Sequence, residues 1–293
     1  MTWVLLAFSS AALLGFYDVF KKRSLKGNAV IPVLFLNTLI CSLLFIPATF
    51  HAPFGGWEVQ RWLVLKAFIV LSSWLCGYFG IKHLPLTLVG PINATRPVMV
   101  LVGALLLFGE RLNGWQWAGV ALAILSFFLL SRSGKKEGID FRHNKWVALI
   151  VLAALLGAVS GLYDKFLMAP VASGGLGLHR LTVQAYFNFY QCAIMGIMVL
   201  AIWRPRRAST TPFHWTWSIP LISLFLSAAD LCYFYALGSE GAMISVVSMI
   251  RRSSVVVSFL VAALVFRERN LKSKAIDLAL VLLSMVCIYI GSR

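Results

Sequence analysis

The chain has 293 residues, of which 60% are hydrophobic and only 12% are charged. Soluble globular domains carry about 25% charged residues, so this composition excludes a soluble enzyme or binding domain and predicts an integral membrane protein. The net charge of +16 does not indicate a nucleic-acid partner. The basic residues lie in short loops between apolar runs, where the positive-inside rule accounts for them.

Ten apolar runs approach the length of about 20 residues that a membrane-spanning helix needs, so the sequence predicts an all-α protein with ten transmembrane helices. The runs cover residues 2–20, 30–50, 63–82, 86–108, 113–131, 146–168, 181–203, 215–238, 241–266 and 272–291. The first is followed by Lys21-Lys22-Arg23 and has no basic residue before it, so we expect a retained helix and not a cleaved signal peptide. Loops after the odd-numbered runs hold 17 of the 26 Lys and Arg residues. This bias places those loops in the cytoplasm and both termini outside the cell membrane.

The two halves of the chain repeat each other. Residues 15–20 read GFYDVF and residues 161–166 read GLYDKF, each at the end of an apolar run. Further matches at offsets of 156 to 158 pair residues 75–79 with 231–235, 108–111 with 266–269, and 121–126 with 279–284. Runs one to five therefore correspond to runs six to ten. Because five is odd, the second copy enters the membrane upside down, which is a 5+5 inverted-topology repeat. The predicted divisions are a first repeat at 1–131, a cytoplasmic linker at 132–145 and a second repeat at 146–293.

This arrangement resembles the drug/metabolite transporter superfamily, specifically its ten-helix EamA-like members. The resemblance is carried by PINATRP at 91–97 leading to FGERL at 108–112, and by the counterpart FRER at 266–269. It implies a central cavity lined by helices 1–4 and 6–9, peripheral fifth and tenth helices, and alternating access. Family substrates include amino acids, nucleotide sugars, choline-like amines, phosphorylated sugars and drugs. The halves differ at this place, because Arg251-Arg252 stand where the fourth run has Asn93-Ala94.

Three arginines lie deep in their runs. Arg96, Arg251 and Arg252 are ten or eleven residues from the start of a run, about 15 Å into a hydrocarbon core of roughly 30 Å. A cation at that depth needs a wet cavity or a partner. We expect these guanidiniums, with Asn93 nearby, to bind an anionic group of a substrate. The alternative is an internal ion pair, for which Asp230 is the best candidate.

Asp18 and Asp164 occupy equivalent places in the repeated motif, at opposite membrane faces. Each could close a gate by pairing with Lys22, Lys82 or Lys165, or could bind a proton, because partial burial raises the proton affinity of a carboxylate. The alternative is a headgroup-level aspartate held by neighbouring lysines. The preceding Tyr17 and Tyr163 could contact substrate or could be ordinary interfacial tyrosines.

Other polar and aromatic residues inside the runs are candidates for lining a site. Asn37 and Gln191 occupy corresponding places in the second and seventh runs, where a polar side chain bridges helices or lines a cavity. Tyr78 and Tyr235, in the third and eighth runs, could form a cation–π wall or could simply pack. The small residues of the fifth and tenth runs could serve internal packing or a homodimer. They are Gly119, Ala123, Ser126, Ala275 and Ala279.

The pattern favours a secondary transporter for a small polar or anionic metabolite, with proton coupling or exchange left open. Efflux of amphipathic drugs or amines and a non-transporting sensor or scaffold are the alternatives. A membrane-embedded enzyme is disfavoured, because the five histidines lie in loops or at the edges of runs and no HExxH motif occurs. No GxxxxGK[ST] loop for ATP is present, and the sequence predicts no catalytic residue, metal site or cofactor.

Overall fold

The computed structural model describes residues 2–96, 98–99, 113–135, 138–168, 171, 174–238, 250–266 and 271–291. Within these ranges the regular secondary structure is helical, and turns and irregular segments connect the helices. The helices are α1 (Thr2–Leu25), α2 (Val30–Leu44), α3 (Ile46–Thr49), α4 (Gly56–His83), α5 (Leu86–Ala94), α7 (Gly114–Lys135), α8 (Lys145–Met168), α9 (Arg180–Met198), α10 (Ser218–Gly238), α12 (Ser254–Val265) and α13 (Leu271–Gly291). A π-helical turn, Val199–Trp203, continues α9. Helices satisfy every backbone polar group within one segment, as hydrocarbon requires.

Within the described ranges, six helices are long and apolar enough to cross a membrane. They are α1, α4, α7, α8, α9 with its π-helical turn, and α13. Shorter apolar helices occupy Val30–Leu44 and Ser218–Tyr233. The chain is therefore an all-α multi-pass membrane protein. The sequence motifs at 100–112 and 267–270, and Pro97, lie outside the described residues.

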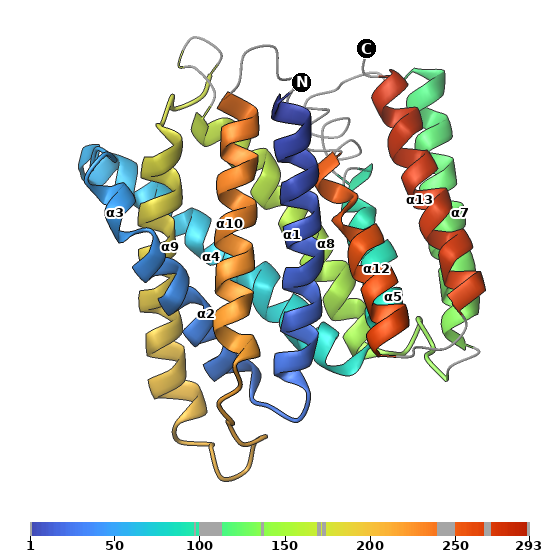
Figure 1. Ribbon diagram of the computed structural model, residues 1–293, viewed down its shortest axis with the longest axis horizontal. Helices are drawn as coiled ribbons and strands as arrows, with labels where there is room; N and C mark the ends of the chain where they lie inside the picture. The colour runs from blue at the N-terminus through green and yellow to red at the C-terminus, as the bar shows by residue number, and fades with distance from the viewer. Residues whose placement is uncertain are drawn as a thin grey trace.

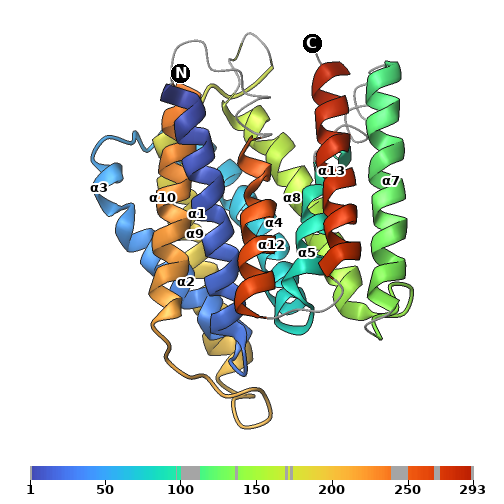
Figure 2. The same ribbon diagram turned by 45° about the vertical axis from the view of Figure 1, so that its right-hand side comes forward.

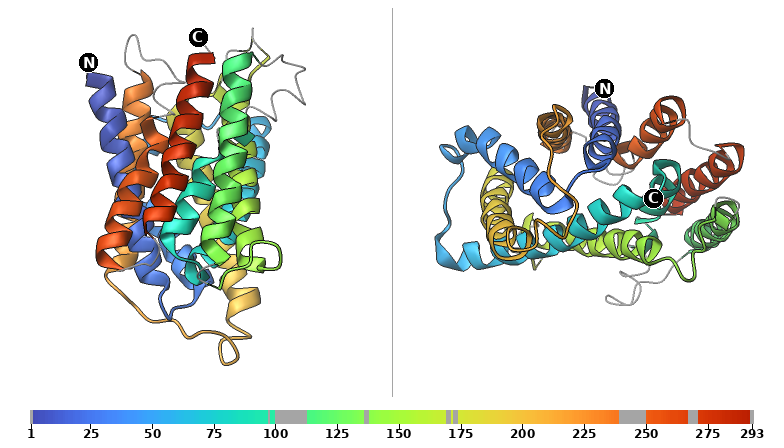
Figure 3. Two further views of the ribbon diagram at one scale, coloured as in Figure 1. Left: turned by 90° about the vertical axis from the view of Figure 1, so that its right-hand side faces the viewer. Right: turned by 90° about the horizontal axis from the view of Figure 1, so that it is seen from below.

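The helices stand side by side in one elongated bundle (Figures 1 and 2). Helix α1 begins, and helix α13 ends, at the same end of the bundle. The connections from α1 to α2 and from α9 to α10 lie at the opposite end. Seen from below, α7 and α13 form one edge of the bundle, and α2 and α9 lie toward the other (Figure 3).

Helices from the two halves of the chain alternate in the packing. Helix α1 packs against α10 and α12, α4 packs against α8 and α9, α2 packs against α9 and α10, α5 packs against α12, and α7 packs against α13. Two of these helix contacts contain a hydrogen bond from a serine hydroxyl to a backbone carbonyl. Ser10 donates to the carbonyl of Ala229 at 2.7 Å between α1 and α10, and Ser73 donates to the carbonyl of Ala153 at 2.8 Å between α4 and α8. Most of the largest buried cluster comes from α1, α2, α4, α5, α8 and α10.

Small residues bring particular helices close together. Gly15, the first residue of the repeated motif, faces α12, where an added Cβ would lie 2.5 Å from the Cβ of Val257. Its counterpart Gly161 has nothing within 4 Å. Gly119 of α7 faces α13, where an added Cβ would lie 2.9 Å from the carbonyl oxygen of Ser284. This glycine therefore serves contact between α7 and α13 within one chain, and a homodimer through these helices stays a prediction.

Two helical segments are interrupted by a hydroxyl residue. Helix α5 continues through Pro91 and ends at Ala94, and the next residue, Thr95, is a turn. Ser253 makes a similar turn between helical residues 250–252 and α12. Both hydroxyls donate to the backbone three residues earlier, Thr95 at 2.7 Å and Ser253 at 2.6 Å. A proline inside a helix removes a backbone donor, which favours such an ending after Pro91.

Candidate functional site

Arg96 follows the turn at Thr95 and lies against helix α8. Its Nη2 donates to Oδ1 of Asn93 at 3.3 Å, which brings together two of the residues expected at the site. The guanidinium covers Gly157, where an added Cβ would be 2.7 Å from the Arg96 Cζ. The Arg96 Nε is buried and has no hydrogen-bond partner among the described residues. A donor in this state is available to an additional acceptor.

Helix α1 places a second cation next to Arg96. Lys21 is 7% exposed, and its Nζ lies 2.6 Å from Oδ1 of Asp18. The same ammonium lies 4.2 Å from the ring centre of Tyr17 and 5.3 Å from that of Tyr78. Both are cation–π contacts, which stabilise a desolvated ammonium. Asp18 and Tyr17 also interact electrostatically with Arg96, so these side chains form one group.

Arg251 forms an ion pair with Asp230 of α10, the partner that the sequence suggests. The Asp230 carboxylate also accepts a hydrogen bond of 3.5 Å from Nε2 of Gln184 on α9. The Arg251 guanidinium lies 4.2 Å from the ring centre of Tyr233. Asp230 thereby joins α9 and α10 to the segment that precedes α12.

Arg252 links these two groups, because Arg96 and Arg251 both act on it electrostatically. We define the central cluster as Asp18, Lys21, Arg96, Asp230, Arg251 and Arg252. Its four cations and two carboxylates leave a net charge of +2. The three arginines are only partly buried. An excess of positive charge inside an apolar bundle is costly, and an anion offsets that cost.

Asp164, the counterpart of Asp18 in the repeated motif, is not part of the central cluster. It forms an ion pair with Lys66 of α4, whose ammonium also lies 4.7 Å from the ring centre of Phe187. Tyr163 donates to the backbone carbonyl of Trp62 at 3.1 Å, so it bridges α8 and α4.

The cations that hold the two motif aspartates are Lys21 and Lys66, neither of which was among the expected partners. Lys22 instead donates to the backbone carbonyls of Ile81 and Leu84 at the end of α4. Lys82 donates to the Thr211 hydroxyl at 2.9 Å. The side chain of Lys165 is not described.

Asn37 and Gln191 are 0% and 1% exposed, in the packed region of α2, α9 and α10. The Asn37 Oδ1 accepts a hydrogen bond of 2.9 Å from the Ser223 hydroxyl of α10, so Asn37 bridges helices. The amide nitrogens of both residues lack partners within the described part of the chain. Neither residue belongs to the central cluster.

Tyr235 does not join the site. Its side chain is 71% exposed, and five residues of helix turn it about 140° away from Asp230 around the axis of α10. Tyr78, the candidate in the third run, is 1% exposed and lies under Lys21. The two tyrosines expected to line a site therefore lie in different surroundings.

Four charged residues of the described ranges are buried although the sequence did not indicate it: Lys21, Lys66, Lys274 and Asp277. Lys66 was assigned to the edge of a run starting near residue 63, but α4 begins at Gly56 and places Lys66 inside the helix. The amphipathic start of α4, with Trp57 and Glu58, could have shown this. Asp277 of α13 is 1% exposed and was not considered, although it is a carboxylate inside a predicted span.

Residues 1–132 match the model of the EamA-like transporter family. The uncharacterized transporter PA0485 of Pseudomonas aeruginosa is 30% identical over 138 residues, which are 43% of this chain and 46% of that protein. The probable 4-amino-4-deoxy-L-arabinose-phosphoundecaprenol flippase subunit ArnE of Pectobacterium atrosepticum is 32% identical over 69 residues, 24% of this chain and 61% of that protein. The matched stretch therefore spans about half of PA0485.

The whole chain also has a counterpart among solved structures. One crystal structure of a protein superposes on 99% of this chain and 98% of its own, with a TM-score of 0.61. The sequences are 18% identical, so this likeness concerns the fold alone.

Proposed function

We propose that this chain belongs to the drug/metabolite transporter superfamily and is a secondary transporter for a small polar or anionic metabolite, a proposal supported by the family match of its first 132 residues and by its transporter-named relatives. The family match and the transporter-named relatives support a membrane transporter. The observation that carries the substrate class is the net charge of +2 in the central cluster, contributed by helices from both halves.

The chemistry of the central cluster favours a carboxylate or phosphate. Guanidinium groups bind both anions with paired hydrogen bonds, and they remain charged at all physiological pH values. Arg96 has a buried Nε without a partner among the described residues, and Arg252 adds a second guanidinium to the central cluster. The relative ArnE is named for a substrate that contains a phosphate, which the same pair of groups would accept.

In this proposal, alternating access requires an inverted repeat. Hydrogen bonds between α7 and α13 support such a repeat. The Ser126 hydroxyl donates to the carbonyl of Asp277 at 2.7 Å, and the Ser284 hydroxyl donates to the carbonyl of Gly119 at 2.6 Å. Adding the repeat offset of 158 converts Ser126 into Ser284 and Gly119 into Asp277. The two bonds are thus equivalent under exchange of the halves.

The helix breaks support the same relation. Thr95 and Ser253 are 158 residues apart, and so are the carbonyls that accept their hydroxyls, Ile92 and Ile250. The backbone bond from Val98 to Thr95 has its equivalent in the bond from Val256 to Ser253. Broken helices at equivalent places of two repeats are typical of transporter binding sites.

We assign the first repeat to residues 1–131, a linker to 132–145 and the second repeat to 146–293, as ten helices in a 5+5 arrangement. The family match ends at residue 132, one residue after the proposed boundary. The partners in the packing also exchange in pairs, because α1 with α10 corresponds to α4 with α8. With the basic loops in the cytoplasm, the protein would lie in the cell membrane.

The ion pairs at the two motif aspartates suggest how access alternates. Asp164 and Lys66 lie on different helices, α8 and α4, whereas Asp18 and Lys21 both lie on α1. We assign one pair to each gate. Opening at one gate separates Asp164 from Lys66, and at the other gate Asp18 and Lys21 move together as part of α1, toward or away from a neighbouring helix. Rocking of one five-helix unit against the other would produce these movements.

The experiment uses purified protein in detergent and in sealed vesicles. A thermal-shift screen with carboxylates, phosphates and amines identifies a ligand, and its radiolabelled form is then followed into vesicles. Arg96→Ala and Arg252→Ala should each weaken binding by about 10- to 150-fold, because a hydrogen bond to a charged group contributes about 1.5–3 kcal/mol. Arg61→Ala is the matched control, since Arg61 is exposed and forms an ion pair of 3.5 Å with the exposed Glu58.

Two results would contradict the proposal. Selective stabilisation by amines, unchanged in both arginine variants, would favour efflux of amphipathic cations. Binding without any flux into vesicles would favour a sensor or scaffold.

A further inference from the structure

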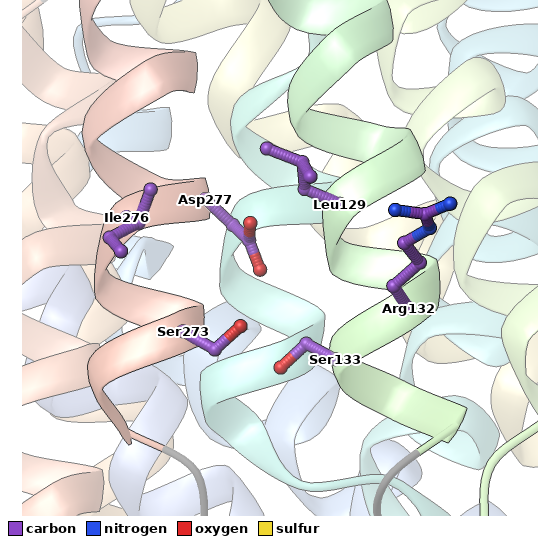
Figure 4. Close-up of a pocket in the computed structure, with 6 residues that line it drawn as sticks. All are labelled: Leu129, Arg132, Ser133, Ser273, Ile276 and Asp277. Atoms are coloured by element: carbon purple, nitrogen blue, oxygen red, sulfur yellow. The ribbon is translucent and has the colours of Figure 1, made fainter.

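A second polar site lies away from the central cluster, at the edge of the bundle. A pocket of about 330 Å³ opens between α7 and α13. Its lining residues are Leu129, Arg132, Ser133, Ser273, Ile276 and Asp277. Figure 4 shows the Asp277 carboxylate pointing from α13 into the gap, toward α7.

The polar atoms of this pocket are buried but unsatisfied. Asp277 and Ser133 are each 1% exposed. The Oδ2 of Asp277 and the hydroxyl of Ser133 have no hydrogen-bond partner in the part of the chain that the structure describes. Buried polar atoms are almost always paired, so an unpaired carboxylate oxygen beside an unpaired hydroxyl marks a place for something else.

The charged groups around Asp277 do not neutralise it. On α7, the Arg132 guanidinium lies 4.9 Å from the Phe128 ring centre, across the pocket from Asp277 (Figure 4). On α13, Lys274 is directed to α5, where its Nζ donates to the Thr87 hydroxyl at 3.0 Å. Helix α5 itself carries no charged residue. Lys135 and Lys272 are exposed near the ends of α7 and α13.

Asp277 differs in this respect from the other membrane carboxylates in the described residues. Asp18, Asp164 and Asp230 each have a Lys or Arg partner within ion-pair distance. An ionised carboxylate without such a partner is very costly in an apolar environment, and binding a proton removes the charge.

We propose that Asp277 is a proton-binding site that exchanges with the aqueous phase through the pocket between α7 and α13. The pocket lies toward the end of the bundle that carries the basic loops, since Asp277 is in the second turn of α13. Release of the proton would place a negative charge three residues from Lys274, on the same face of the helix. The charge would draw the ammonium away from Thr87 and so weaken the contact between α13 and α5.

A lipid-soluble carbodiimide tests this site, because it modifies protonated carboxyl groups in apolar surroundings and spares ionised ones. Purified protein in vesicles is treated over a range of pH, and the modified peptides are quantified by mass spectrometry. We expect Asp277 to be labelled, at a rate that falls as the pH rises. Asp277→Asn should remove the label, and Asp230 serves as the internal control that stays unlabelled because it is paired with Arg251.

Three outcomes would overturn the proposal. One is the absence of label at Asp277 at every pH, and another is a rate that does not depend on pH. The third is protection of Asp277 by sodium at constant pH, which would make the pocket a metal-cation site. The test needs no substrate, so it can fail while the transport proposal stands.

Discussion

A substitution at Gly157 would move the Arg96 side chain while Arg96 itself stays unchanged. The C-terminal half of α8 holds Gly157 against the guanidinium, and the Cβ of an alanine there would lie 2.7 Å from the Arg96 Cζ. Ordinary contacts begin at 3.4 Å, so Gly157→Ala must displace the guanidinium by at least 0.7 Å. The displaced atoms are the end of a flexible side chain. The fold should therefore tolerate the change.

Gly157→Ala should leave the stability nearly unchanged but weaken the binding of the ligand. Alanine in a helix interior is more stable than glycine by roughly 0.5–1 kcal/mol, which offsets the cost of moving the arginine. The free energy of unfolding should thus stay within about 1 kcal/mol of the original value. Loss of a charge-assisted hydrogen bond should weaken binding of the anionic ligand by about 10- to 150-fold.

The assay compares ligand affinity and thermal unfolding for Gly157→Ala, for Arg96→Ala and for the double variant. Gly161→Ala is the control, because Gly161 lies one turn further along α8 with nothing within 4 Å. If Gly157→Ala acts through Arg96, the double variant should bind no more weakly than Arg96→Ala alone. Unchanged affinity in Gly157→Ala, or additive losses in the double variant, would refute the placement of Arg96 at the ligand.

Two further predictions concern stability. Asp230→Ala should lower the free energy of unfolding by about 3 kcal/mol, the low end for breaking a buried ion pair, because the Arg251 and Asp230 side chains are 20% and 17% exposed. The double variant with Asp230→Leu and Arg251→Met should regain most of this lost free energy when unfolding is measured in detergent. A double variant that is as unstable as Asp230→Ala would contradict this reasoning. Gly119→Leu should cost about 1–3 kcal/mol by forcing α7 from α13. Gly114→Leu is the control, because an added Cβ at Gly114 meets nothing within 4 Å among the described residues, and it should lower the stability little. If Gly114→Leu and Gly119→Leu lowered the stability equally, the close contact of Gly119 with α13 would not be the cause.

The sequence predicted the helical membrane fold well because hydropathy is summed over many residues. Described helices occur within every predicted run, and α8 matches its run to one residue at the start and none at the end. The start of α4 was placed seven residues late, because the window required apolar residues and α4 begins with a polar turn. The pair of Asp230 and Arg251 was predictable, since two opposite charges in hydrocarbon have few other partners.

The direction in which individual side chains point was harder to predict from the sequence. Tyr235 and Tyr78 lie in corresponding runs, the eighth and the third, yet one is exposed and the other buried, because rotation about a helix axis depends on neighbouring helices. Lys66 and Asp277 each count as one charge in a long apolar run and barely change its average. Only the packing of α4 on α8 shows that Lys66 meets Asp164.

The equivalent breaks at Thr95 and Ser253 carry their arginines on opposite sides. Arg96 comes after its break, whereas Arg251 and Arg252 come before theirs. A ligand held between the two segments would meet one guanidinium from one half and two from the other. Turning such a molecule end for end would exchange these unequal surroundings, so the protein would distinguish head from tail although its scaffold is built from two copies of one unit.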